Sequence, residues 1–118
     1  MVVDVADEER TDRVLNALAD PTRRDIVRRA MADEHSVSAL ARCYPMSFAA
    51  VQKHVAVLER AELVTKRRRG REQLVHTNID TIRTAHRALD QLEAVWRSRI
   101  DRFGDVLAEP TEGASPCP

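Results

Sequence analysis

The residues whose types and spacing are best suited to chemistry lie between positions 47 and 77, where a polar-faced helix precedes a basic hairpin. The predicted helix covers residues 47–61, and apolar runs on either side of positions 66–71 predict two short strands. Five of the six residues in the segment 66–71 are cationic. A helix that can enter a groove, followed by cations that can reach phosphate, is the layout of a winged helix-turn-helix. The pattern therefore points to double-stranded DNA as the partner.

One face of the 47–61 helix carries side chains that suit base edges. At 100° per residue the helix has an apolar stripe, and Lys53 points almost directly away from it. Lys and Gln donate to guanine and adenine edges, small Ala residues allow close approach, and a helix N-terminus suits a phosphate. Ordinary exposed polar residues on an amphipathic helix are the alternative interpretation. The residues expected in the core are Phe48, Val51, Val55 and Leu58. The candidate DNA contacts are Ser47, Ala49, Ala50, Gln52, Lys53 and His54.

The hairpin adds a second candidate contact. Gly70 can adopt positive φ in a tight turn, with arginines on both sides of it. Arginine at a loop tip can hold a phosphate or enter a narrow minor groove. The alternative is a solubilising surface loop. The candidate contacts here are Arg67, Arg68, Arg69 and Arg71.

Charge is distributed unevenly along a chain whose formal net charge is zero. Residues 1–20 carry two Arg against six acids, and residues 72–118 carry five Arg against eight acids. Residues 21–71 carry twelve cations against five acids. Attraction of phosphate needs local rather than net charge, so the central segment is a candidate nucleic-acid binder.

Length and composition limit the other possibilities. A chain of 118 residues has room for one domain with a small core. No apolar run approaches the roughly 20 residues that span a bilayer, and the acidic N-terminus is unlike a signal peptide, so we expect a cytoplasmic protein with no membrane partner. The only two cysteines are Cys43 and Cys117, and an internal disulfide is not expected. Cys43 is expected to be a small core residue, although a redox role for it stays open.

The predicted fold class is mostly α with a small β-hairpin wing, a dimeric winged helix-turn-helix of about five helices. We expect disorder over 1–7, one DNA-binding and dimerisation domain over 8–103, and a disordered tail over 104–118. Asp20 and Pro21 favour the start of a helix over 21–32. The other predicted elements are a helix over 8–18, a strand over 36–37, a helix over 39–43 capped by Ser38, and a long helix over 79–103.

The long helix carries one apolar stripe over about seven turns. This stripe is too wide for the core of a 90-residue domain, so part of it should be buried against a second copy. Its residues are Ile79, Ile82, His86, Leu89, Glu93, Trp96, Ile100 and Phe103.

With these residues in place, the chain resembles the ArsR (arsenical-resistance regulator) family of bacterial dimeric winged-helix repressors. The matching stretches are residues 17–24, 36–37 with 40–41, 46–47 with 50–55, 57–64 and 68–71. The resemblance covers about residues 12–103, and the ordered set of motifs is highly specific.

The resemblance implies a homodimer held by the first and last helices, with the Ser47 helix in the major groove. It also implies repression of transcription at a palindromic operator. The dimer-interface residues expected on this basis are Val14, Leu18, Ile82, His86, Leu89, Glu93, Trp96, Ile100 and Phe103.

The sequence departs from the metal-sensing members of that family. Their Cys-Val-Cys or Cys-Val-Gly motif falls on Ser36-Val37-Ser38, where no thiolate is available. The Asp, His, His, Glu set of the zinc sensors falls on Asp80, Ile82, Glu93 and Trp96, and hydrocarbon and indole side chains cannot hold zinc. We therefore expect no metal or cofactor at these sites and leave the inducing ligand unknown; an atypical site remains open.

Two functions from different classes follow. The first is a sequence-specific DNA-binding regulator that represses as a homodimer. The second is a winged-helix protein-interaction module whose basic hairpin contacts an acidic partner rather than DNA. The sequence contains no phosphate-binding glycine loop and no nucleophile–base arrangement, so an enzyme is not expected.

Overall fold

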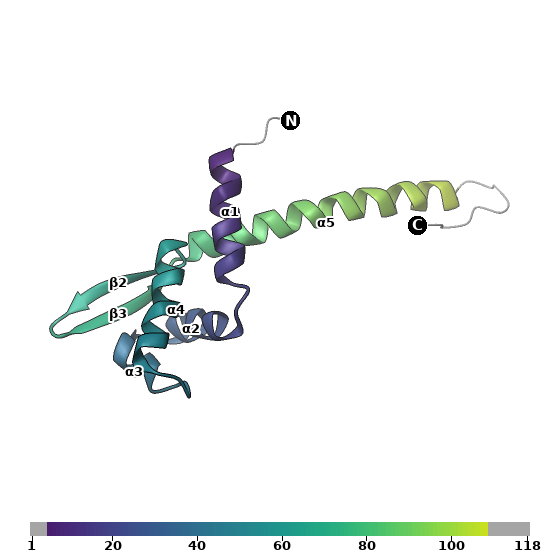
Figure 1. The fold of residues 1–118 in the computed structure, drawn as a ribbon. Helices are drawn as coiled ribbons and strands as arrows, with labels where there is room; N and C mark the ends of the chain where they lie inside the picture. The colour runs from purple at the N-terminus through teal and green to yellow at the C-terminus, as the bar shows by residue number, and fades with distance from the viewer. Residues whose placement is uncertain (1–4, 109–118) are drawn as a thin grey trace. The chain divides into compact units, whose positions relative to one another are not determined.

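The computed structural model describes residues 5–108, which form five helices and a three-stranded antiparallel sheet (Figure 1). The winged helix-turn-helix fold predicted from the sequence is confirmed. The chain divides into two compact units between Ala85 and His86. The range 8–103, expected to be a single domain, therefore includes most of the first unit and part of the second. None of the helices among the described residues is long and apolar enough to cross a membrane.

The helices follow local sequence signals. Asp20 accepts a hydrogen bond from Arg23 N at 2.9 Å, and Pro21 occupies the first turn of α2, so this helix has the predicted bounds. The helix-turn-helix consists of α3, the turn that follows it, and α4. The helices are α1 (Val5–Ala17), α2 (Pro21–Ala32), α3 (Val37–Ala41), α4 (Phe48–Arg60) and α5 (Ile79–Ala108).

Both terminal helices are longer than predicted. Residues 5–7, expected to be disordered, belong to α1, whose acidic first turn suits the positive end of the helix dipole. Residues 104–108 of the expected tail belong to α5, because one Gly inside a long helix costs only about 1 kcal/mol relative to Ala. Residues 1–4 and 109–118 lie outside the described residues.

The start of α3 corrects a predicted cap. The helix begins at Val37 rather than at Ala39, and its cap is Ser36 rather than Ser38. Ser36 Oγ accepts a hydrogen bond from Ala39 N at 3.0 Å. Ser36 also ends strand β1 (His35–Ser36), and this extended backbone suits an N-cap residue.

The sheet has the order β1–β3–β2, with β2 (Val64–Arg69) and β3 (Glu72–Thr77) forming the wing. Arg69 pairs with Glu72, so the hairpin loop is only Gly70 and Arg71, and Gly70 has a φ of 63°. Four of the cations expected in a loop, at positions 66–69, therefore lie on a strand instead. In Figure 1 the wing projects away from the helices of the first unit.

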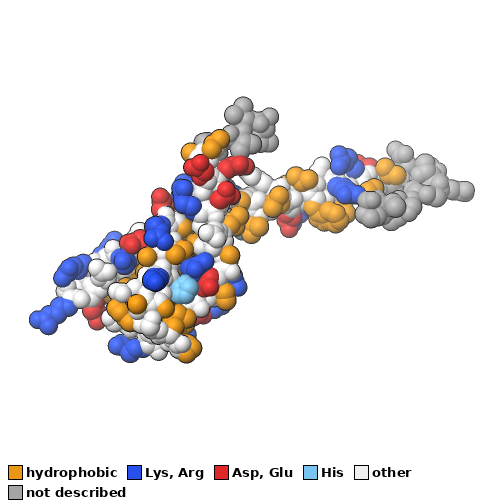
Figure 2. Space-filling view, viewed as in Figure 1, with side chains coloured by type: hydrophobic (Ala, Val, Ile, Leu, Met, Phe, Trp, Pro, Cys, Tyr) orange, Lys and Arg blue, Asp and Glu red, His pale blue; other side chains and the backbone are white. Residues whose placement is uncertain are grey.

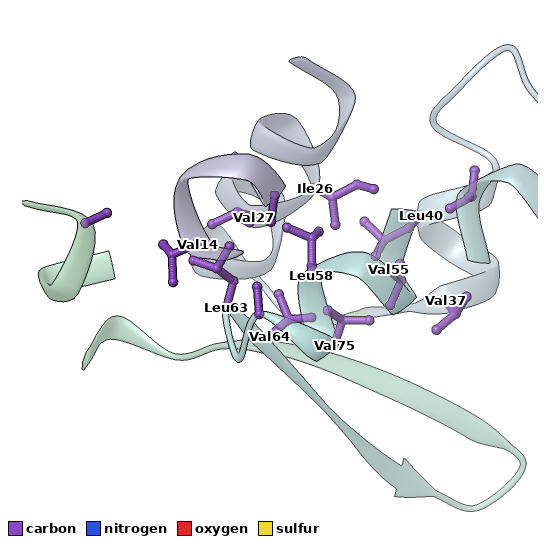
Figure 3. Close-up of a cluster of buried hydrophobic side chains, with 14 residues drawn as sticks. Val14, Ile26, Val27, Val37, Leu40, Val55, Leu58, Leu63, Val64 and Val75 are labelled. Atoms are coloured by element: carbon purple, nitrogen blue, oxygen red, sulfur yellow. The ribbon is translucent and has the colours of Figure 1, made fainter. Parts of the chain in front are cut away.

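The core of the first unit is built around α4. Val51, Val55 and Leu58 of this helix are 0–1% exposed. Figure 3 shows the cluster of buried side chains that surrounds them. Phe48, the fourth residue of the predicted apolar stripe, is 47% exposed, because it lies in the first turn of the helix, beyond the end of the core. The labelled members of the cluster are Val14, Ile26, Val27, Val37, Leu40, Val55, Leu58, Leu63, Val64 and Val75.

The turn after α4 ties this helix to the wing and to α5. Glu62 has a φ of 62°, in the left-handed region that commonly ends helices, and Leu63 N donates to Leu58 O at 2.9 Å. Thr81 in the first turns of α5 is fully buried, and its Oγ1 donates to Glu62 O at 2.6 Å. This hydrogen bond satisfies a carbonyl at the point where α4, the wing and α5 meet.

Replacing Thr81 with Val keeps the shape of the side chain and removes this hydrogen bond. We expect the free energy of unfolding to fall by about 1–2 kcal/mol, because Glu62 O would lose a buried partner. Urea unfolding followed by circular dichroism measures the change. Thr65→Val, at an exposed position of β2, is the matched control and should change stability by less than about 0.5 kcal/mol. A Thr81→Val protein as stable as the wild type would contradict the role assigned to this contact.

Candidate nucleic-acid interface

The outward face of α4 presents most of the predicted contacts. Ser47 begins the helix as its N-cap, with Oγ accepting from Ala50 N at 3.1 Å. Ser47, Ala49, Gln52 and Lys53 are exposed, whereas Ala50 is half-buried. Their position follows from the buried stripe on the other side of the helix. We call the exposed set Ala49, Gln52 and Lys53 the reading face.

His54 is the predicted contact that the structure places differently. Its side chain is 22% exposed, and its Nδ1 lies 3.4 Å from the Arg23 guanidinium and 3.9 Å from Asp20 Oδ2. The Arg23 backbone N–H holds the pKa of the Asp20 carboxyl below its usual range, with the nearby His54 contributing less. His54 is therefore held against the N-terminus of α2 rather than free at the surface.

Arg23 is a positioning residue that the sequence reasoning did not identify. Its Nε donates to Ala17 O at 2.6 Å and its guanidinium to Asn16 O at 3.2 Å, at the end of α1. The same guanidinium contacts His54 on α4. One side chain thus braces three helices behind the reading face. The Asp20-Pro21 helix start places Arg23 in the first turn of α2 and was the available signal.

Acidic residues partner two of the wing's cations, and a backbone carbonyl partners a third. Lys66 Nζ lies 3.4 Å from Glu59 Oε1, and Arg69 lies 3.1 Å from Glu34 Oε2. Arg68 Nε donates to Gly70 O at 3.3 Å. All residues from Lys66 to Arg71 are exposed, and Figure 2 shows the resulting blue patch on the projecting hairpin. Exposed pairs of this kind are weak and can exchange an acid for a phosphate.

A pocket of about 350 Å³ lies between the start of α3, the reading-face helix and the wing. Gln52 lines it from α4, and Arg68 and Arg71 line it from the wing. Three predicted DNA contacts from two separate elements are thus brought to one place. We call this cavity the α4–wing pocket.

A partly exposed cluster of polar side chains links the turn of the helix-turn-helix to α2. The Tyr44 hydroxyl donates to Asp25 Oδ2 at 2.7 Å, and Arg29 Nε donates to the same oxygen at 2.8 Å. Arg28 pairs with the other carboxylate oxygen. The Tyr44 hydrogen bond, followed by those from Arg29 and Arg28, holds the pKa of Asp25 far below its usual range. Burial, together with the carboxylate, raises the pKa of Tyr44.

Cys43 is exposed rather than buried under the turn, so the expectation of a core cysteine was wrong. It follows the end of α3, where the chain has already left the core, and its Sγ donates to Ala39 O at 3.4 Å. Tyr44 rather than Cys43 fills the space beneath the turn.

The predicted dimer-interface residues fall into two groups. Val14 is fully buried in the core of its own protomer and is therefore withdrawn from the interface, and Leu18 and Ile82 pack against the same core. The second unit is different, because most of its apolar side chains are exposed, with Trp96 at 58%. His86 and Glu93 are exposed as well, and Phe103 is half-buried under Arg99. The exposed large apolar residues in the described part of this unit are Leu89, Leu92, Val95, Trp96, Ile100 and Val106.

The family's metal positions offer few ligand atoms here. Ser36 Oγ is engaged in capping α3, and Ile82 and Trp96 carry no suitable donor. Within residues 5–108, no three His, Cys, Asp or Glu side chains are grouped so as to hold a metal ion. The side chains present therefore do not fit the zinc or arsenical sites of that family.

Comparisons with known proteins agree with this architecture. A helix-turn-helix domain model matches residues 18–67. The chain is 43% identical over 99 residues to the HTH-type transcriptional regulator Rv2034 of Mycobacterium tuberculosis, covering 81% of this chain and 87% of that protein. It superposes on an ArsR-like transcriptional regulator from Rhodococcus sp. RHA1 with a TM-score of 0.75 and 28% identity, covering 91% and 100% of the two chains. It also superposes on the homodimeric winged helix-turn-helix DNA-binding domain of Mb0332 from Mycobacterium bovis, a possible ArsR-family regulator. That superposition has a TM-score of 0.63 at 27% identity and covers 80% of this chain and 90% of that chain.

The Asp25 cluster makes stability depend on pH in one direction. Because the folded-state pKa of Asp25 is lowered, its stabilisation is fully present above about pH 4 and is lost progressively as the pH falls from there through the folded value. Asp25→Asn should therefore lower the free energy of unfolding by about 1–3 kcal/mol at neutral pH, and by less at about pH 3. Urea unfolding at both pH values tests this. Asp101→Asn, exposed on α5, is the control; an Asp25→Asn deficit that is the same at both pH values would refute the assignment.

Proposed function

Because the chain belongs to the ArsR family of winged helix-turn-helix transcriptional regulators, we propose that it represses transcription as a homodimer bound to a palindromic operator. The observation that carries this proposal is the convergence of the reading face and the basic wing beside one pocket. It acts in the bacterial cytoplasm, where the DNA is.

The reading face supplies the sequence readout. With α4 in the major groove, Lys53 donates to guanine edges and Gln52 to adenine edges, while Ala49 lets the helix approach the base pairs. Ser47 and the N-terminus of α4 contact a phosphate, with Ala50 beside them. His54, braced by Arg23, is a flanking contact that fixes the angle of the helix.

The wing supplies contacts that are largely independent of sequence. Arg67, Arg68, Arg69 and Arg71 are exposed and bind phosphate, or enter a narrow minor groove at the hairpin tip. Glu34 and Glu59 hold two of the wing's cations in the absence of DNA. Phosphates replace these acids on binding, so affinity depends strongly on salt.

The part of α5 that lies in the second unit supplies most of the dimer contact. Leu89, Trp96 and Phe103 recur every seven residues, the repeat by which two helices pack along a seam. Ile82 begins the same series in the first unit, where it packs against the core of its own protomer. Exposed apolar side chains along this helix, orange in Figure 2, are more than a monomer normally leaves to water. Ile100 extends the seam, and His86 and Glu93 flank it. A two-fold dimer then places two reading helices on half-sites about 34–36 Å apart.

Lys53→Ala should weaken binding to the operator about tenfold and relax the base preference at one position of each half-site, because one base-edge donor is lost. Fluorescence anisotropy on single-base operator variants measures both effects. Arg83→Ala, an exposed α5 position paired with Asp80, is the control and should bind like the wild type. If Lys53→Ala retains the wild-type affinity and base preference, the assignment of the reading face fails.

The wing should respond to charge rather than to sequence. Arg69→Ala should reduce the slope of log affinity against log salt by about 1, without changing base preference. Glu34→Gln should strengthen DNA binding about twofold to fivefold, because Arg69 no longer has to separate from an acidic side chain before it binds a phosphate. Anisotropy at several salt concentrations measures the slopes. Unchanged affinity in both variants would mean that the wing does not contact DNA, as in a winged-helix module that binds a protein.

Trp96→Glu should convert the dimer to a monomer and reduce operator affinity at least about tenfold, since a charge is placed in the apolar seam. Analytical ultracentrifugation gives the mass, and anisotropy gives the affinity. Ser98→Glu introduces the same charge about 160° around the same helix and should remain dimeric. A dimeric Trp96→Glu protein would place the interface elsewhere.

A further inference from the structure

The α4–wing pocket has a composition that DNA contact alone does not explain. Its volume of about 350 Å³ falls within the range of roughly 300–1,000 Å³ typical of small-molecule sites. We propose that the pocket binds a small carboxylate with a planar apolar body, such as an aromatic monocarboxylate, and that this ligand displaces DNA. The displacement rests on the proposed function, whereas the binding does not.

Three of the ten residues that line the pocket are apolar, namely Val37, Phe48 and Val55, and we call them the apolar wall. Val37 and Val55 contribute from α3 and α4, and both belong to the buried core. Phe48 completes the wall with a half-exposed ring that follows directly on the capped start of α4. A large aromatic side chain beside two buried valines offers a surface for a flat apolar group. Apolar side chains offer a phosphate oxygen neither a hydrogen bond nor a positive charge, so phosphate binding does not account for this wall.

The wing contributes three cations to the lining. Lys66 and Arg68 lie two residues apart on β2 and so project from the same face of the strand, and Arg71 joins them from the hairpin loop. Glu72 is the one acid among the lining residues. Lys66 is already close to Glu59, so Arg68 and Arg71 are the main anchors for an anion. Guanidinium groups bind a carboxylate through two parallel hydrogen bonds, which favours a planar carboxylate over a spherical ion.

The same side chains serve both ligands. Gln52 lines the pocket and belongs to the reading face, and Arg68 and Arg71 are proposed phosphate contacts. A carboxylate in the pocket occupies the two arginines and covers Gln52, so the carboxylate and DNA exclude each other. By linkage, each must weaken the binding of the other by the same factor. Release of the operator then needs no metal and no change of fold.

Direct binding is tested first, on the full chain without DNA. 4-Fluorobenzoate is titrated with protein and followed by ¹⁹F NMR, with 4-fluorobenzamide as the neutral analogue and inorganic phosphate, followed by ³¹P NMR, as the anion without an apolar body. We expect saturable binding of 4-fluorobenzoate with a Kd on the order of 1 mM or tighter, and about tenfold weaker binding of the other two. Equal binding of all three, tighter binding of phosphate, or no binding of 4-fluorobenzoate overturns the proposal.

Matched variants then locate the site. Phe48→Ala and Arg68→Ala should each weaken 4-fluorobenzoate binding about tenfold, since one removes the apolar wall and the other a carboxylate partner. Arg67→Ala removes the same charge from the other face of β2 and should keep the 4-fluorobenzoate Kd within about twofold, although it weakens DNA binding. An equal loss in Arg67→Ala and Arg68→Ala would show diffuse charge attraction and overturn the pocket assignment.

The DNA experiment separates the two proposals. If duplex binds and 4-fluorobenzoate does not, the pocket serves DNA alone, and this inference fails while the proposed function stands. If 4-fluorobenzoate binds and no duplex does, the pocket stands and the proposed function fails. If both bind, 4-fluorobenzoate at a concentration near its wild-type Kd should raise the apparent Kd for the operator in the wild type and much less in Phe48→Ala. An unchanged wild-type Kd overturns the mutual exclusion.

Discussion

Burial of one stripe of α4 is the constraint on which the rest of the molecule depends. Val51, Val55 and Leu58 face the core, so the 3.6-residue repeat leaves Lys53 and its neighbours pointing outward. The same core continues through Leu63 and Val64, from which the wing begins. One packed cluster therefore orients both the reading face and the basic hairpin. The hydrogen bond from Tyr44 to Asp25 holds the turn before α4 against α2, and the contact of Arg23 with His54 holds α4 itself against α2.

Elements with strong local signals were predictable from the sequence, and those decided by tertiary contacts were not. The Asp20 cap and Pro21 define α2 without help from the rest of the chain, and Gly70 between two apolar runs indicates the hairpin. The exposure of Phe48 and Cys43 could not be read from periodicity, because it depends on where the core ends. Val14 was expected at the dimer interface, and only the packing shows that it lies in the core of its own protomer. Arg23, with hydrogen bonds that reach α1 and α4, carries no periodic signal at all.

Acids beside the wing connect its electrostatics to its function. Glu34 and Glu59 lie against Arg69 and Lys66, so the cations of the wing are held in place without DNA. Exposed pairs are weak enough that phosphates can take over the cations without a large cost. The neutral net charge of the chain is thus compatible with a local field that favours DNA. The α4–wing pocket uses the same field, which is why a small carboxylate there would compete with the operator.

The central claim is that this chain binds a specific duplex through α4 and the wing. Fluorescence anisotropy of the purified protein with the duplex upstream of its own gene, at several salt concentrations and with unrelated DNA as competitor, tests it most directly. The account predicts tight binding that survives the competitor and weakens steeply with salt, because several phosphates are neutralised. A genome-derived duplex library would extend the test if the operator lies elsewhere. Failure to bind any genomic duplex in preference to the competitor would contradict the account.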